Sequence, residues 1–80
     1  MWHVYTLKSS VNKRLYTGYT EDLEQRIISH NSGKVRSTKS YRPYTLVYKE
    51  SYNNKMEARK RELFLKSGVG RQYLKTVITD

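Results

Sequence analysis

Two alternating segments near the start of the chain, joined by turn residues, constrain the fold more than any other feature. In the segment WHVYTL at residues 2–7, successive side chains would point to opposite faces of a strand. The segment is also rich in β-branched and aromatic residues, which is typical of a strand. The turn residues SSVNK follow, and RLYTGYT returns as a second extended segment. The sequence therefore predicts a β-hairpin of residues 2–8 and 14–19. Its register stays open, but in any plausible register Tyr5 and Tyr16 lie opposite or diagonal to one another.

Gly18 interrupts the second of these segments, in LYTGYT. A glycine weakens a strand because it leaves a gap where a side chain would pack. Its presence therefore indicates a bend, a bulge, or a close approach by another backbone or a ligand.

A helix is predicted to start at Thr20, whose side chain can cap it, and to end near Gly33 in NSGK, the expected left-handed terminator. The two acidic residues that follow Thr20 suit the positive end of the helix dipole. The face that packs on the sheet carries Leu23, Arg26, Ile27 and His30. A cation such as Arg26 is costly beside a packed face unless it has a function there.

The rest of the chain predicts one further strand and two further helices. YTLVYKESY is the expected third strand, with Tyr44, Leu46 and Tyr48 on one face. Asn54 and the Glu three residues later mark the start of the helix KMEARKRELFLK, and the glycines of SGVG are expected to close it. RQYLKTVI is expected to form a short last helix, packed through Tyr73, Leu74 and Val77. The predicted order is β-β-α-β-α-α in one domain spanning residues 1–80.

The charge of the chain points to a polyanionic partner. Sixteen Lys and Arg face seven Asp and Glu, a net charge of +9, and eight tyrosines supply rings that can stack on bases. A solubilising surface or an anionic membrane are the alternatives, but no basic amphipathic segment stands out. The polar loop KVRSTKSYRP carries four cations that we expect to contact the sugar-phosphate backbone: Lys34, Arg36, Lys39 and Arg42.

The chain has no cysteine, which excludes disulfides and thiolate metal sites. The segment MWHVYTLKSS at its start is too short and too polar for a secretory signal. No apolar run approaches the length that spans a membrane. We therefore expect a soluble, cytoplasmic protein with no membrane partner.

Glu62 is the most informative acid, because it lies in the middle of a predicted helix in line with Ala58 and Leu65. One interpretation is a partly exposed Glu paired with Arg59 or Lys66. The other is a ligand of Mg²⁺, which takes one or two carboxylates, keeps several waters and completes its shell with phosphate oxygens. A single Glu supports one metal ion and not a two-metal arrangement.

Four further side chains have both a structural and a chemical interpretation. Arg26 is either a cation whose stem covers the sheet or a guanidinium fork for phosphate oxygens. His30 is either structural or a group that transfers a proton or binds phosphate. Tyr5 and Tyr16 are either strand aromatics or catalysts, and a tyrosine with an ordinary pKa of about 10 needs cationic surroundings to act as a base near neutrality.

Together these signals strongly resemble the GIY-YIG nuclease family over essentially the whole chain. The resemblance rests on HVY at residues 3–5, YTG at residues 16–18, and the segments TEDLEQRIISHNSG and EARKRELFLKSG. It is closest to small single-domain members, and related domains form the N-terminal part of a bacterial excision-repair endonuclease. The resemblance implies an α+β fold with a three-stranded antiparallel sheet flanked by helices. It also implies hydrolysis of DNA phosphodiesters with one divalent cation, Mg²⁺ or Mn²⁺.

The resemblance also assigns roles to individual residues. Tyr16 is the candidate for activating the attacking water and Tyr5 supports it, whereas Arg26 and His30 match the active-site helix. Glu62 matches the metal-binding Glu. The motif glycine, Gly18, is expected to leave space beside the phosphate.

The chain departs from the family pattern at three points. His3 and Thr17 replace the usual Gly and Ile of the two motifs, and no Asn follows Glu62, where several catalytic members have one. Gln72 is the nearest chemical substitute. A nucleic-acid-binding module with little or no activity is therefore the alternative to a nuclease, and a structural basic protein is a remoter one. RNA as the substrate and a protein partner that supplies specificity both stay open.

Overall fold

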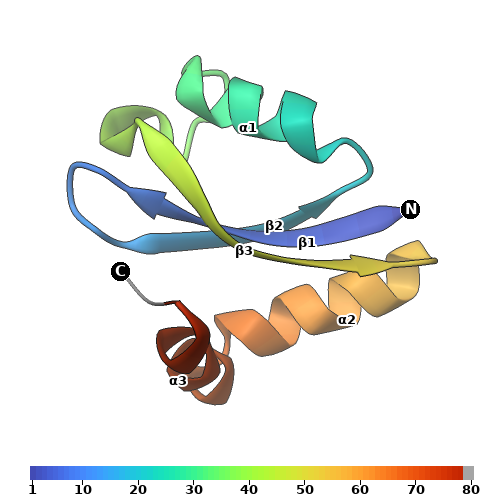
Figure 1. Cartoon of the computed structure of the whole chain (residues 1–80). Helices are drawn as coiled ribbons and strands as arrows, with labels where there is room; N and C mark the ends of the chain where they lie inside the picture. Colours follow the sequence, from blue (N-terminus) through green and yellow to red (C-terminus); the bar gives the residue numbers. More distant parts are fainter. Residues whose placement is uncertain (79–80) are drawn as a thin grey trace.

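The structure of the chain, a computed structural model, describes residues 1–78 (Figure 1). Its strands are β1 (Trp2–Ser9), β2 (Leu15–Thr20) and β3 (Tyr44–Tyr52). Its α-helices are α1 (Leu23–Asn31), α2 (Lys55–Lys66) and α3 (Gly68–Val77), and the 3₁₀ turn η1 (Lys39–Tyr41) precedes β3. Within residues 1–78, no helix is long and apolar enough to cross a membrane.

The three strands form an antiparallel sheet in the order β2-β1-β3, so β2 is an edge strand. Figure 1 shows α1 on one face of the sheet and α2 and α3 on the other. The predicted α+β fold and its β-β-α-β-α-α order are confirmed. Tyr5 pairs with Gly18 and Leu7 with Tyr16, so the two tyrosines are diagonal neighbours on the face that α1 covers.

Each face of the sheet has its own small core. Tyr5, Leu7 and Tyr44 are buried under α1, with Leu23 and Ile27 of that helix packed against them. The core on the other face consists of Val4 from the central strand and three helix residues, Ala58, Leu65 and Leu74. The central strand therefore anchors both layers, as its alternating pattern predicts.

The predicted alternation along β3 is wrong at Tyr48. Thr6 pairs with Tyr48 but Leu7 pairs with Leu46, so Val47 is an extra residue in β3. This bulge reverses the side-chain alternation, because a strand has a period of two. Tyr44 and Leu46 therefore pack under α1, whereas Tyr48 packs on the α2 face.

The first helix starts two residues later than predicted. Thr20 is still part of β2, and its hydroxyl accepts the N–H of Asp22 at 3.1 Å. The cap of α1 is the carboxylate of Asp22, which accepts the N–H of Gln25 at 3.1 Å. At the other end the prediction is confirmed, because Gly33 follows the helix with a positive φ of 83°.

The junction of α2 and α3 also differs from the prediction. Asn54 caps α2 as expected and accepts the N–H of Glu57 at 2.8 Å. However, the glycines do not close α2, because Ser67 follows α2 directly and caps α3, so Gly68 and Gly70 lie in the first turn of α3. A Cβ on Gly70 would lie 1.9 Å from the carbonyl oxygen of Phe64, so this glycine lets the two helices approach closely.

Of the three residues predicted to pack in the last helix, only Leu74 is buried. Tyr73 and Val77 are exposed large hydrophobic residues. The short helix therefore makes its core contact mainly through one side chain.

Candidate active site

The fold brings four of the predicted site residues together on the α1 face of the sheet. Tyr5 Oη lies 3.0 Å from His30 Nε2 and 3.3 Å from Arg26 Nε. The ring of Tyr16 meets the ring of His30 edge-on, with 4.8 Å between their centroids. Strand pairing supplies the tyrosines, and the spacing of four residues in α1 places Arg26 and His30 on the same helix face.

Gly18 is the reason that Tyr5 can reach this cluster. It faces Tyr5 across the β1–β2 pair, and a Cβ on Gly18 would lie 2.6 Å from Tyr5 Oη and 2.8 Å from Tyr5 Cζ. The space that the glycine leaves is therefore filled by the phenol of Tyr5, whereas the resemblance implied open space beside a phosphate. The glycine therefore admits the side chain of Tyr5 into the cluster.

We expect Gly18→Ala to displace the phenol of Tyr5 and to separate it from Arg26 and His30. Overpacking of this kind costs about 1–3 kcal/mol of unfolding free energy. Gly68→Ala is the matched control, because nothing lies within 4 Å of a Cβ at Gly68 in the first turn of α3. Chemical denaturation of both variants checks the prediction, and a Gly18→Ala protein as stable as Gly68→Ala would contradict it.

His30 is held by hydrogen bonds that determine its tautomer. The hydroxyl of Thr38 donates to the carbonyl of Val35 at 3.3 Å, so its oxygen accepts from His30 Nδ1 at 2.9 Å. This leaves Nε2 without a proton, and it accepts the O–H of Tyr5. Thr38 is fully buried and positions His30. The sequence carries no signal for Thr38, because only the folded loop brings it to the helix.

The charges in this cluster are distributed unequally. Burial, reinforced by the charge of Arg26, lowers the pKa of His30 to about 4, so the imidazole is neutral at pH 7. Burial also raises the pKa of Tyr5, although the hydrogen bond from Arg26 opposes this. The hydrogen bond with Tyr5 raises the pKa of Arg26 further. Arg26 is thus the permanent positive charge of the cluster.

The two tyrosines differ in how solvent reaches them. Tyr5 is only 1% exposed, whereas Tyr16 is partly buried and lines a groove in the surface. Solvent therefore reaches Tyr16 from the groove, whereas Tyr5 is enclosed.

Glu62 approaches the cluster from the other face of the sheet. Its carboxylate is 4% exposed, with Oε1 at 2.8 Å from Arg59 Nη1 and Oε2 at 2.8 Å from Lys66 Nζ. Lys66 Nζ also lies 5.8 Å from the centre of the Tyr16 ring. Glu62 is therefore paired as one interpretation expected, but with both cations and in a buried position.

The donor set at Glu62 fits one divalent cation. The side chains of Arg59 and Lys66 are 52% and 45% exposed, so either can turn into solvent and free a carboxylate oxygen. Within residues 1–78, no three His, Cys, Asp or Glu side chains gather into a metal-binding group. One carboxylate, waters and substrate phosphate oxygens match Mg²⁺ with a single protein ligand.

Glu50 is the other acid on the α2 face, and it is already saturated. Arg61 donates to both its oxygens, at 2.9 and 3.0 Å, and the hydroxyls of Tyr48 and Tyr52 donate to it as well. A carboxylate with four donors has little capacity left for a metal ion. Glu50 therefore has a structural role between β3 and α2.

The remaining predicted residues lie outside this cluster. The four loop cations, Lys34, Arg36, Lys39 and Arg42, are all exposed and follow α1 directly. Gln72, the nearest substitute for the missing Asn, is exposed on α3.

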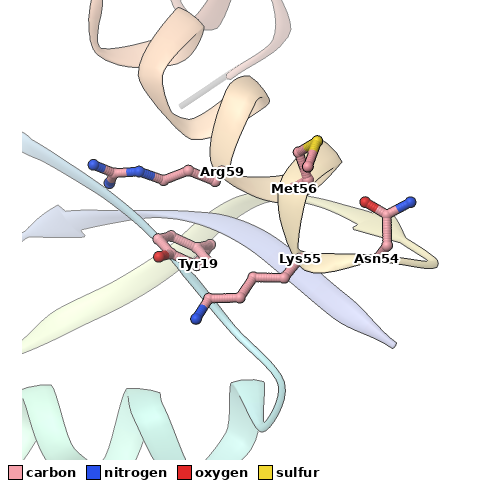
Figure 2. Close-up of a pocket in the computed structure, with 5 residues that line it drawn as sticks. All are labelled: Tyr19, Asn54, Lys55, Met56 and Arg59. Carbon is pink, nitrogen blue, oxygen red and sulfur yellow. The ribbon is translucent and has the colours of Figure 1, made fainter.

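Besides a hollow of about 500 Å³ that Arg26 of the cluster lines together with Tyr19 and Thr20, two hollows of the surface lie along the edge strand β2. One, of about 610 Å³, is lined by Tyr19 and the start of α2, and Figure 2 shows the side chains of Arg59 and Lys55 extending past Tyr19. The guanidinium of Arg59 lies 5.7 Å from the centre of that ring. The other, of about 720 Å³, contains Tyr16.

The chain is similar to known proteins over most of its length. Residues 1–74 match the model of the GIY-YIG catalytic domain. A UPF0213 protein from Staphylococcus haemolyticus is 45% identical over 76 residues, which are 94% of this chain and 92% of that protein. A UPF0213 protein from Clostridium perfringens is 41% identical over 96% of this chain and 83% of that protein.

A solved structure extends the likeness to the fold. The solution NMR structure of the UPF0213 protein BH0048 from Bacillus halodurans superposes with a TM-score of 0.58 at 34% identity. The match covers 95% of this chain and 84% of that one. The chain therefore belongs to the GIY-YIG catalytic domain family.

Proposed function

We propose that this protein is a metal-dependent endonuclease that hydrolyses DNA phosphodiester bonds. Its family is one of nucleases, which act on nucleic acid. The observation that carries the proposal is the convergence of Tyr5, Tyr16, Arg26 and His30 at the edge strand, with a buried Glu62 beside them. A binding surface needs cations and aromatic rings, whereas a carboxylate beside them adds a group that can hold a divalent cation.

The accessible Tyr16 assists activation of the attacking water in this proposal. The hydroxyl of Tyr5 is held by His30 and Arg26, so Tyr5 keeps the guanidinium in place beside Tyr16. Arg26 holds the phosphate as negative charge develops on it, because its fork matches two phosphate oxygens. His30 is neutral and keeps Tyr5 oriented through Nε2.

Glu62 is the ligand that we propose for a single Mg²⁺ or Mn²⁺. When bound, such an ion neutralises charge on the phosphate and lowers the pKa of a water. The chain contributes the carboxylate, and its two half-exposed partners, Arg59 and Lys66, would turn into solvent when the ion binds.

A nucleic-acid-binding module without activity is the second candidate. The pairing of both Glu62 oxygens with cations and the lack of an Asn after Glu62 favour it. DNA is the partner that we propose, and RNA is the alternative substrate. A protein that supplies specificity would be an additional partner.

Cleavage of single-stranded, duplex and branched DNA with Mg²⁺, Mn²⁺ or EDTA tests the proposal. We expect cleavage with either metal and none in EDTA. Tyr16→Phe keeps the ring but removes the hydroxyl, so it should slow cleavage by about 10²-fold or more and leave binding unchanged. Tyr41→Phe, at an exposed tyrosine outside the cluster, is the matched control. Metal-dependent cleavage at an equal rate by Tyr16→Phe would remove Tyr16 from the mechanism.

The four loop cations carry a separate prediction about binding. Each phosphate that is neutralised on duplex DNA contributes about −0.9 to the slope of log affinity against log salt. Replacing Lys34, Arg36, Lys39 and Arg42 with Gln should therefore flatten that slope and weaken binding to all sequences alike. Titrations at several salt concentrations measure it, and an unchanged slope would show that the loop only connects α1 to β3.

A further inference from the structure

A basic groove opens beside Tyr16, on the opposite side from the loop that the sequence singled out. It has a volume of about 720 Å³ and lies between the β1–β2 turn and the helices α2 and α3. Five of the residues that line it are cations: Lys13, Arg14, Lys66, Arg71 and Lys75.

Three separate parts of the chain supply these cations. Lys13 and Arg14 come from the turn of the hairpin, Lys66 ends α2, and Arg71 and Lys75 are four residues apart on α3 and share a face of that helix. Figure 1 shows the hairpin turn and α3 at the same end of the molecule. The fold therefore gathers charges that are dispersed in the sequence.

Among residues 1–78, most of these cations have no carboxylate partner. Lys66 pairs with Glu62, but within residues 1–78 no carboxylate forms an ion pair with Lys13, Arg14, Arg71 or Lys75. Four unpaired cations in one concavity repel each other, and low-dielectric walls focus their field into the groove. Such a site attracts a polyanion and gains affinity by releasing the counterions of that polyanion.

The groove is continuous with the candidate active site. Tyr16 lines it, and Lys66 links it to Glu62 because the same ammonium lies 2.8 Å from Glu62 and 5.8 Å from the Tyr16 ring centre. We propose that the groove binds the sugar-phosphate backbone of the nucleic acid on one side of the bond to be cleaved. This proposal rests on the proposed function, since it is the position of Tyr16 that makes a nucleic acid the occupant.

The test compares two pairs of lysines with equal charge. Lys13→Gln/Lys75→Gln removes two groove cations, and Lys49→Gln/Lys60→Gln removes two exposed lysines that do not line the groove. Affinity for labelled single-stranded and duplex oligonucleotides is measured in EDTA over a range of salt. We expect the groove variant to bind about tenfold more weakly and to lose about 1.8 from the duplex salt slope, while the control keeps its slope.

Shortening the oligonucleotide locates the contact. Nucleotides are removed from either end of the oligonucleotide. Removal from one end only should weaken its affinity for the natural chain, until that affinity equals its affinity for the groove variant. The groove variant should lose nothing further on the same truncation. Equal weakening by both lysine pairs, or a groove variant that still responds to truncation, would overturn the proposal.

Cleavage measured on the same variants separates this proposal from the proposed function, and a second polyanion tests the class of ligand. Groove-dependent binding without metal-dependent cleavage would contradict the proposed nuclease and support the groove proposal. Cleavage that does not depend on Lys13 or Lys75 would support the nuclease and contradict the groove proposal. Poly-glutamate is the probe for an acidic protein, and tighter binding of it than of the oligonucleotides would overturn the assignment to nucleic acid.

Discussion

Glu62→Gln should abolish cleavage while DNA binding in EDTA stays intact or becomes slightly tighter. The substitution keeps the shape of the side chain and removes the negative charge that we propose holds a divalent ion near Tyr16. In a protein of net charge +9, the loss of a carboxylate does not weaken attraction to DNA. Cleavage and binding measured on the same preparation check both parts, and we expect a rate loss of at least about 10³-fold.

The partners of Glu62 explain why the variant should still fold. Arg59 and Lys66 are about half exposed, so water takes over their charges when the carboxylate is gone. Because the buried amide keeps the shape of the side chain but loses two charge-assisted hydrogen bonds, we expect a loss of unfolding free energy of about 1–3 kcal/mol. Glu57→Gln is the matched control, because it removes the same charge from the exposed first turn of the same helix.

A second readout does not depend on activity. Ligand binding to the folded state stabilises it, by about 2.7 kcal/mol when the ligand is at 100 times its dissociation constant. Mg²⁺ or Mn²⁺ should therefore stabilise the natural chain and Glu57→Gln, but not Glu62→Gln. Full metal-dependent cleavage by Glu62→Gln would end the assignment of Glu62, and no cleavage by any of the three proteins would favour the binding module.

Arg26→Lys should lower the cleavage rate by about 10²–10³-fold although the charge is kept. Arg26 Nε donates to Tyr5 Oη at 3.3 Å, and the ends of its guanidinium are the groups that we propose for the phosphate. A lysine ammonium offers neither the planar fork nor a second donor along the stem. It can serve as a point charge for binding, so affinity in EDTA should change little.

The control for Arg26 is Arg36→Lys, at an exposed position of the loop. Both substitutions are chemically identical, so a difference in rate reports the position and not the residue type. Circular dichroism and thermal unfolding establish that both variants fold. If Arg26→Lys cleaves as fast as Arg36→Lys, Arg26 contributes only general positive charge.

The local signals of the sequence determined most of the elements. The hairpin, the placement of Tyr5 and Tyr16 on its two strands, the cap at Asn54 and the left-handed Gly33 follow from residues within one turn or one strand pair. The shared face of Arg26 and His30 follows from helix periodicity alone. Such features depend on neighbours in the chain, so a pattern of residue types is sufficient to predict them.

Only the tertiary structure decided which groups meet. The bulge at Val47 depends on how β3 pairs with β1, and it moved Tyr48 to the other face. The neighbour of Gly18 is a phenol from another strand, and Thr38 reaches His30 through a folded loop. Residue types at a distance in sequence cannot specify these contacts without the three-dimensional path of the chain.

The candidate site was likewise predicted partly from the sequence and determined partly by the tertiary structure. Its candidate residues came from motif spacing, but the burial of Glu62 and the state of its two oxygens depend on packing of α2 against the edge strand. The basic groove at Lys13, Arg71 and Lys75 was invisible in the sequence, because its charges come from a turn and a helix more than fifty residues apart. Charge composition predicted a polyanion, and the fold decided where the polyanion can lie.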